Sequence, residues 1–131
     1  MIIGEVHILP SDKTPEIFLN PEGTIRIRGR GLGVSRTHET DQVLDWIDLY
    51  LKNPAEVTYV SITFEYLNSH STTTLFTILK RITQVLLKSR KLKVLWYYEE
   101  DDDDILERGE FISSSLNIPI EFLMTHKSAD Y

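Results

Sequence analysis

Two strand-like segments, separated by one long amphipathic segment, lie between residues 57 and 98 of this chain. The first runs from Val57 to Tyr66 and alternates apolar and polar side chains, with Val60, Ile62, Phe64 and Tyr66 on one side. The middle segment repeats apolar residues at helical spacing, and these are Leu75, Ile78, Leu79, Ile82, Val85 and Leu86. The last, Leu92 to Tyr98, is apolar on both faces, which predicts an interior strand covered from two sides. This succession predicts a βαβ unit with a right-handed crossover and two parallel strands.

The segments before this unit predict a hairpin and a helix. Ile2 to Leu9 is apolar enough for an opening strand, and Glu16 to Leu19 and Thr24 to Arg28 flank a turn whose proline and glycine suit a hairpin. After a loop rich in glycine and hydroxyl residues, Thr40 is expected to cap a helix that ends at Asn53-Pro54. The apolar face of that helix comprises Val43, Leu44, Ile47, Tyr50 and Leu51.

The end of the chain predicts one more helix and one more strand. The helix is expected over Asp104 to Leu116, and the strand over Ile118 to Leu123, where Pro119 indicates a sheet edge. A chain of 131 residues is long enough for one core and too short for two. We therefore expect a single α/β domain over residues 1–124, with a mixed sheet and flanking helices, and a polar tail over residues 125–131.

Composition limits the functions open to such a domain. The formal net charge is -6 and the pI is near 5.1, which argues against a nucleic-acid partner because phosphate backbones require a basic surface. No apolar run approaches the roughly 20 residues that span a bilayer, and the acidic Glu5 follows the start too closely for a signal peptide, so we expect a cytoplasmic protein without a membrane partner. The chain contains no cysteine, so it has no disulfide and no thiolate ligand or nucleophile.

The βαβ unit brings two polar segments to one edge of the sheet. Parallel strands end at the same edge, so the turn Asn68 to Thr74 and the acidic run Glu99 to Asp104 are expected to be neighbours at the edge where α/β domains usually carry their function. The turn contains up to five hydroxyl residues, of which helix capping requires only one. A phosphorylation switch is the alternative to capping, because a phosphate at a helix start meets a positive helix end and free backbone donors.

Other chemical interpretations of the same residues are weaker. The acidic run could hold magnesium, but consecutive carboxylates diverge, and such runs are usually solvated loops that also supply acids to the next helix. His70 beside Ser69 cannot form a catalytic triad by adjacency, and no partner carboxylate is identifiable. The glycines from Gly29 to Gly33 lack the spacing of a phosphate loop. We therefore predict no enzymatic activity, no cofactor and no metal site.

Four groups of residues resemble the SiaC family of bacterial regulatory phosphoproteins, over about Thr14 to Phe122. They are Lys13-Thr14-Pro15-Glu16-Ile17; Trp46-Ile47 with Tyr50-Leu51-Lys52-Asn53-Pro54; Phe64-Glu65-Tyr66-Leu67-Asn68-Ser69-His70-Ser71; and Trp96-Tyr97-Tyr98-Glu99-Glu100-Asp101-Asp102-Asp103. The resemblance implies a fold similar to the STAS domains of anti-anti-sigma factors. It also implies that the unphosphorylated protein binds and activates a diguanylate cyclase with a GGDEF domain, that a serine/threonine kinase phosphorylates it, and that a PP2C-type phosphatase restores it.

In the family the modified hydroxyl follows the asparagine of the turn directly, and that position is Ser69 here. The family usually carries threonine at this position, and serine preserves the chemistry. We expect the partner surface to lie at this edge and to comprise Asn68, Ser69, His70, Ser71, Tyr97, Tyr98, Glu99, Glu100, Asp101 and Asp102. The alternatives are a STAS-like anti-anti-sigma-type adaptor in another partner-switching system and a small magnesium-dependent phosphotransfer enzyme.

Overall fold

The computed structural model of the protein describes residues 3–11, 14–30 and 38–126. Its elements in chain order are β1 (Val6–Ile8), β2 (Glu16–Asn20), β3 (Thr24–Gly29), α1 (His38–Tyr50), β4 (Val57–Phe64), α2 (Ser69–Ile82), the 3₁₀ helix η1 (Thr83–Lys88), β5 (Lys91–Glu99), α3 (Asp103–Leu116) and β6 (Ile120–Thr125). Residues 31–37, which make up most of the loop predicted between Gly29 and Glu39, lie outside the described part of the chain.

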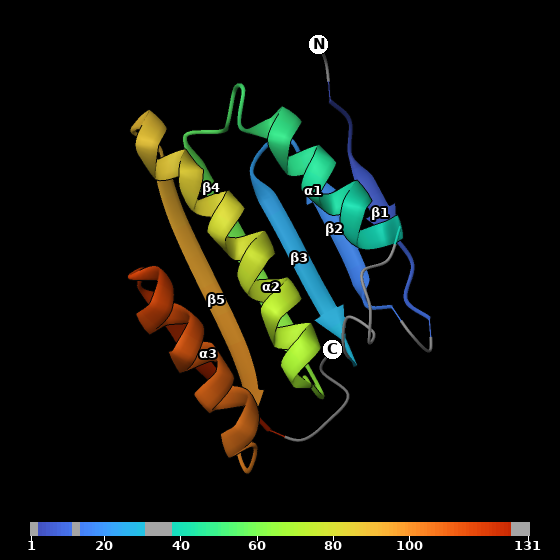
Figure 1. The fold of residues 1–131 in the computed structure, drawn as a ribbon, viewed down its shortest axis with the longest axis vertical. Coiled ribbons are helices and arrows are strands. Elements are labelled where there is room, and N and C mark those ends of the chain that lie inside the picture. The colour runs from blue at the N-terminus through green and yellow to red at the C-terminus, as the bar shows by residue number, and fades with distance from the viewer. Residues whose placement is uncertain (1–2, 12–13, 31–37, 127–131) are drawn as a thin grey trace.

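The strands form one six-stranded mixed sheet whose spatial order follows the chain, from β1 to β6 (Figure 1). The pairs β1–β2 and β2–β3 are antiparallel, and β3 to β6 run parallel to one another. In the predicted βαβ unit, Val60 on β4 lies opposite Val94 on β5. The single α/β domain with a mixed sheet, the hairpin and the βαβ unit are therefore confirmed.

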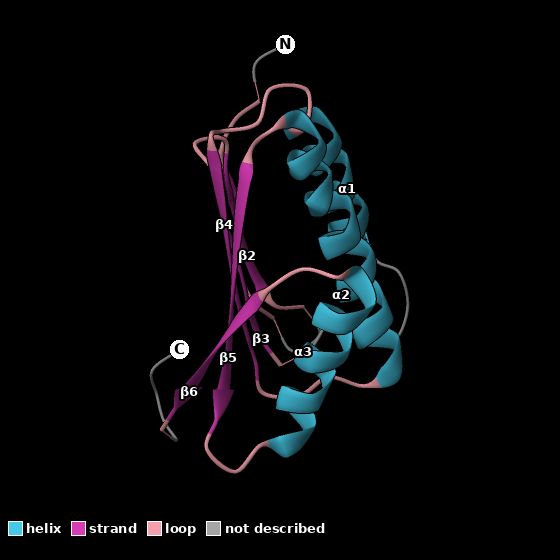
Figure 2. Cartoon of the chain, turned by 90° about the vertical axis from the view of Figure 1, so that its left-hand side faces the viewer, coloured by secondary structure: helices cyan, strands magenta, loops and turns pink. Residues whose placement is uncertain are grey.

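Helices α1, α2 and α3 lie on one face of the sheet, and in the described part of the chain the other face carries no helix (Figure 2). The three crossovers that join β3 to β6 all advance in the same direction across the sheet, so right-handed connections place every helix on the same side. The prediction that β5 is covered from two sides is therefore wrong. Val94 and Trp96 are buried under the helices, whereas Leu95 and Tyr97 lie on the open face and are only half-buried.

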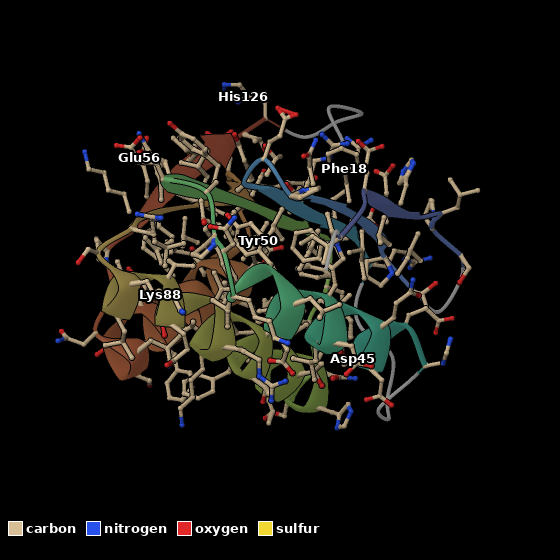
Figure 3. All side chains as sticks on the ribbon, turned by 90° about the horizontal axis from the view of Figure 1, so that it is seen from above. Phe18, Asp45, Tyr50, Glu56, Lys88 and His126 are labelled. Carbon is tan, nitrogen blue, oxygen red and sulfur yellow. The ribbon has the colours of Figure 1, made fainter. Side chains whose placement is uncertain are left out.

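The core lies between the sheet and the helical layer. Tyr50 at the end of α1 points into this layer, while Phe18 lies on the opposite side of the sheet and Asp45 on the outer side of the helices (Figure 3). The Tyr50 hydroxyl is buried, forms a hydrogen bond with Thr58 Oγ1 (2.7 Å) and accepts one from the backbone N–H of Ala55. Besides Tyr50, the largest fully buried side chains are Ile17, Leu19, Ile25, Ile27, Ile47, Ile62, Leu67, Leu75, Ile78, Leu79 and Trp96.

Three predicted details of the first half of the chain differ from the structure. The opening strand is limited to Val6–Ile8 in the described residues. Helix α1 begins at His38, so Thr40 lies buried within its first turn instead of capping it. Strand β4 ends at Phe64, and Tyr66, which the alternation placed on the buried side, is 60% exposed because the chain has already left the sheet.

The second half shows two more differences. The α-helix α2 passes into the 3₁₀ helix η1 at Thr83. Because a 3₁₀ helix has about three residues per turn, the side chains of η1 do not continue the buried face of α2. Val85 stays buried but Leu86 is 46% exposed, so the prediction for Leu86 is wrong. Strand β6 begins after Pro119 at the sheet edge, as that proline indicates, but it extends to Thr125, the first residue of the predicted tail.

One charged cluster links the first three strands on the open face. The Glu16 carboxylate is hydrogen-bonded to His7 Nε2 (2.7 Å) and accepts a second hydrogen bond from Arg28 Nε. These two hydrogen bonds, first that of His7 and then that of Arg28, lower the pKa of Glu16 from its usual value of 4.5. The negative form of Glu16 is therefore stabilised in the folded protein.

Candidate switch site at the carboxyl edge of the sheet

Helices α2 and α3 both begin at the edge where the parallel strands end (Figure 1). Thr63 and Tyr97, near the ends of β4 and β5, are register partners. Arg108 on α3 bridges the two helices, since its Nη1 donates a hydrogen bond to Thr72 Oγ1 on α2 (2.8 Å). The same arginine contacts Asp104 Oδ2 (3.0 Å), so the predicted proximity of the hydroxyl-rich turn and the acidic run is confirmed at Asp104, the last residue of that run.

Asn68 is the N-cap of α2. Its backbone is extended, and its Oδ1 accepts a hydrogen bond from the backbone N–H of Ser71 (2.7 Å). Thr72 Oγ1 donates to the Asn68 carbonyl (2.8 Å), and both Ser71 and Thr72 are buried, at 2% and 7% exposed. Thr73 is exposed, and its Oγ1 donates to the carbonyl of Ser69 (3.0 Å). Several of the hydroxyls thus complete the start of the helix, in addition to the single side-chain cap.

Ser69 is the first residue of α2, and its side chain is exposed. This side chain takes no part in the capping contacts, which its neighbours Asn68, Ser71 and Thr72 make. His70 is exposed beside it, whereas the buried Ser71 supports the turn from inside. Within the predicted partner surface, Ser69 and His70 are therefore the side chains of this turn that an approaching protein meets first.

The acidic run is distributed over a turn and a helix start. Asp102 is the N-cap of α3, where its Oδ1 accepts from the backbone N–H of Ile105 (3.0 Å), and Asp103 and Asp104 lie in the first turn. Glu99 ends β5, while Glu100 and Asp101 are exposed in the turn that follows. Among the residues that the structure describes, no group of three or more histidine, aspartate or glutamate side chains is arranged to hold a metal ion. Asp102, Asp103 and Asp104 cap and begin α3, as the end of such a run usually does.

Tyr97 and Tyr98 point to opposite faces of the sheet because they are consecutive on β5. Tyr98 packs against the core under the helices, and Tyr97 lies on the open face. A partner that contacts the edge can therefore reach both tyrosines only by wrapping around the end of β5.

Sequence reasoning missed Arg108. Its Nε donates to Asp104 Oδ2 (3.0 Å) one helical turn earlier, and the i, i+4 spacing of these opposite charges on the predicted helix was a visible signal. The contact with Thr72 joins residues 36 positions apart and carries no such signal.

The fold and this edge define a small α/β domain that presents an exposed serine at a helix start beside an acidic turn. The chain belongs to the SiaC family regulatory phosphoproteins, whose family model matches residues 8–125. It is accordingly a regulator and not an enzyme. No helix in the described ranges is long and apolar enough to cross a membrane.

Solved structures support the fold. SiaC of Pseudomonas aeruginosa matches with a TM-score of 0.80 at 19% sequence identity, covering 94% of this chain and 100% of that chain. A chain in the crystal structure of the diguanylate cyclase SiaD in complex with its activator SiaC, from the same organism, matches with a TM-score of 0.79 at 20% identity, covering 92% and 99%. Apo-SiaC from Pseudomonas aeruginosa gives a TM-score of 0.76 at 20% identity, covering 92% and 98%. A search of curated proteins found no match.

Proposed function

We propose that this chain, in its unphosphorylated form, binds and activates a GGDEF-domain diguanylate cyclase in the cytoplasm. Phosphorylation of Ser69 by a serine/threonine kinase releases the cyclase, and a PP2C-type phosphatase restores the active form. Two findings support the proposal: the chain belongs to a family of regulatory phosphoproteins, and the related SiaC is the activator of SiaD.

We assign the modification to Ser69 because its side chain is exposed. A kinase must bring the acceptor hydroxyl into its own active site, so a buried hydroxyl is a poor substrate. Ser71 and Thr72 are buried, whereas the Ser69 side chain is exposed at the first position of α2. Of these three hydroxyls, Ser69 is the one that a kinase can reach without unfolding the start of the helix.

Phosphorylation would act on the surface and leave the fold intact. A phosphoserine adds about -1.5 to -2 charges, which a helix N-terminus tolerates. The same charge would stand at the edge of the sheet that also carries the exposed Glu100 and Asp101, and a partner would have to desolvate it on binding. We expect the affinity for the partner to fall by a few kcal/mol, about the cost of an uncompensated charge in an interface.

The test measures cyclic-di-GMP synthesis by the GGDEF-domain protein encoded nearest to this chain, with the regulator unmodified, phosphorylated, or phosphorylated and then treated with phosphatase. Unmodified protein and Ser69→Ala should activate the cyclase. Phosphorylated protein should not, and phosphatase should restore activation. Ser69→Asp should reduce activation in part, because it has one charge and a different shape.

The matched control is Thr77→Asp, which adds the same charge at an exposed position of α2 two helical turns later, away from the edge. It should activate the cyclase nearly as well as the unmodified protein. Full activation by protein stoichiometrically phosphorylated at Ser69 would refute the mechanism. Phosphorylation-dependent binding of an anti-sigma kinase, without any effect on the cyclase, would favour the adaptor alternative.

A further inference from the structure

Arg108, on α3, contacts α2 at Thr72, three residues after the proposed phosphorylation site. Its side chain is 26% exposed and makes two polar contacts, with Thr72 Oγ1 on α2 and with Asp104 Oδ2 on α3. The Asp104 carboxylate is 60% exposed, so water screens this ion pair and its net contribution is small. The guanidinium is therefore held near the start of α2 by contacts that a stronger anion can displace.

Ser69 lies on the same side of α2 as this guanidinium. Residues three apart on a helix are neighbours, with Cβ atoms about 5–6 Å apart, so Ser69 adjoins Thr72, which Arg108 contacts. The opposite flank of α2 faces α1, as the ion pair between Arg81 and Asp48 shows. Helix α2 thus presents Ser69 toward α3 and Arg81 toward α1.

We propose that Arg108 binds the phosphate when Ser69 is phosphorylated, exchanging its contacts with Thr72 and Asp104 for a charge-assisted pair with the phosphoserine. This inference rests on the proposed modification of Ser69. A guanidinium offers a planar fork of donors that matches phosphate oxygens, and a doubly charged phosphate outcompetes a single exposed carboxylate. A rotation of the long arginine side chain closes the remaining gap.

The exchange would change the surface in two ways. The phosphate would be held against the junction of α2 and α3 instead of moving freely in water. Asp104 would lose its cation and present an unpaired carboxylate to solvent, while the net charge of the edge would stay as the phosphate sets it. Both changes would oppose a partner that contacts the ends of α2 and α3.

The test uses full-length protein with phosphoserine incorporated at position 69 during translation, so that it requires neither the kinase nor the cyclase. ³¹P NMR follows the second ionisation of the phosphoserine, whose pKa is ordinarily about 6. A nearby guanidinium favours the doubly charged form and lowers that pKa. We expect the phosphoserine pKa in Arg108→Gln to be higher than in the wild type by at least about 0.5 pH units, from the usual effect of a neighbouring cation.

The matched control is Arg81→Gln, which removes an arginine of α2 itself, whose ion pair is with Asp48 on the α1 side. It should leave the phosphoserine pKa at the wild-type value. Every variant retains His70, the exposed neighbour of the phosphoserine. Circular dichroism should show the same helix content in the wild type, Arg108→Gln and Arg81→Gln. Arg108→Lys keeps the positive charge without the planar fork of donors, and its phosphoserine pKa should lie between those of the wild type and Arg108→Gln.

A second measurement does not depend on any variant. The Nε–H resonance of Arg108 should shift between the unmodified and the phosphorylated wild-type protein. An unchanged resonance would overturn the inference. Equal phosphoserine pKa values in the wild type and Arg108→Gln would also overturn it. Failure of the proposed function is a separate result. If phosphoserine at position 69 pairs with Arg108 but cyclase activation persists, the proposed function fails and the phosphate-binding role stands.

Discussion

Gly109 lies on the face of α3 that packs against the sheet, where a methyl group has no space. A Cβ built on Gly109 would lie 2.6 Å from Cε2 and 2.8 Å from Cδ2 of Trp96, and 2.7 Å from Cε1 of Phe122. Real Cβ atoms essentially never approach other atoms so closely. Trp96 is fully buried, and its Nε1 donates to the Ile105 carbonyl (3.1 Å), so its ring cannot easily move aside. We therefore expect Gly109→Ala to push α3 away from the sheet.

The sign of the stability change follows from two opposing effects. Alanine in a helix interior is favoured over glycine by about 1 kcal/mol. Overpacking a core costs about 1–3 kcal/mol, and the cost here should be at the upper end because three ring atoms are involved and one ring is held by a hydrogen bond. We predict that Gly109→Ala lowers the free energy of unfolding by about 1–2 kcal/mol, from the difference between these two effects.

Urea denaturation, followed by tryptophan fluorescence and circular dichroism, measures this change. The control is Ser115→Ala, at an exposed position of the same helix, which should gain a few tenths of a kcal/mol from helix propensity alone. Gly109→Ala protein as stable as the wild type, with an unchanged urea dependence, would refute the reasoning. It would mean that α3 packs less closely on the sheet than the contacts of Gly109 indicate.

Leu79 lies on the buried side of α2 and is 1% exposed. Leu79→Ala should lower the free energy of unfolding, measured by urea denaturation, by about 2–5 kcal/mol, the usual cost of emptying a core site. Asn68→Ala removes the side-chain cap of α2 and should cost about 0.5–2 kcal/mol in the same assay. Glu16 has a lowered pKa in the folded protein, so its stabilisation is present above its unfolded value of 4.5 and is lost as the pH falls through the lower folded value. Glu16→Gln should therefore flatten the decline of stability below about pH 5, and an unchanged acid profile would refute this role.

Periodicity made the architecture predictable, because a strand with one buried face and an amphipathic helix each leave a regular pattern. The helical stripe through Leu75, Ile78 and Leu79 corresponds to residues that are all about 1% exposed or less. The arrangement of helices on a single face was not predictable from β5, because Leu95 and Tyr97 are apolar although they lie on the open face. A sheet face without helices can still carry large apolar side chains when neighbouring strands cover their sides.

The candidate site was predictable where it depends on topology and not where it depends on contacts across the chain. The parallel strands brought the start of α2 and the turn after β5 to one edge, as expected. The burial of Ser71 follows from its place four and seven residues before Leu75 and Ile78 of the helical stripe, although the hydroxyl-rich segment reads as uniformly polar. Arg108 reaches this edge only because α3 packs beside α2, and no local pattern predicts that packing.

The position of Ser69 explains how a proposed switch can be built into a helix start without weakening the fold. The capping contacts of α2 come from Asn68, Ser71 and Thr72, so the exposed Ser69 side chain can change its chemistry while these contacts persist. A phosphate on Ser71 or Thr72 would instead have to enter the core or break the first turn. In the proposed switch, the modified residue therefore differs from the residues that hold the helix, and this separation would let a change of surface charge act on a partner while the regulator itself stays folded.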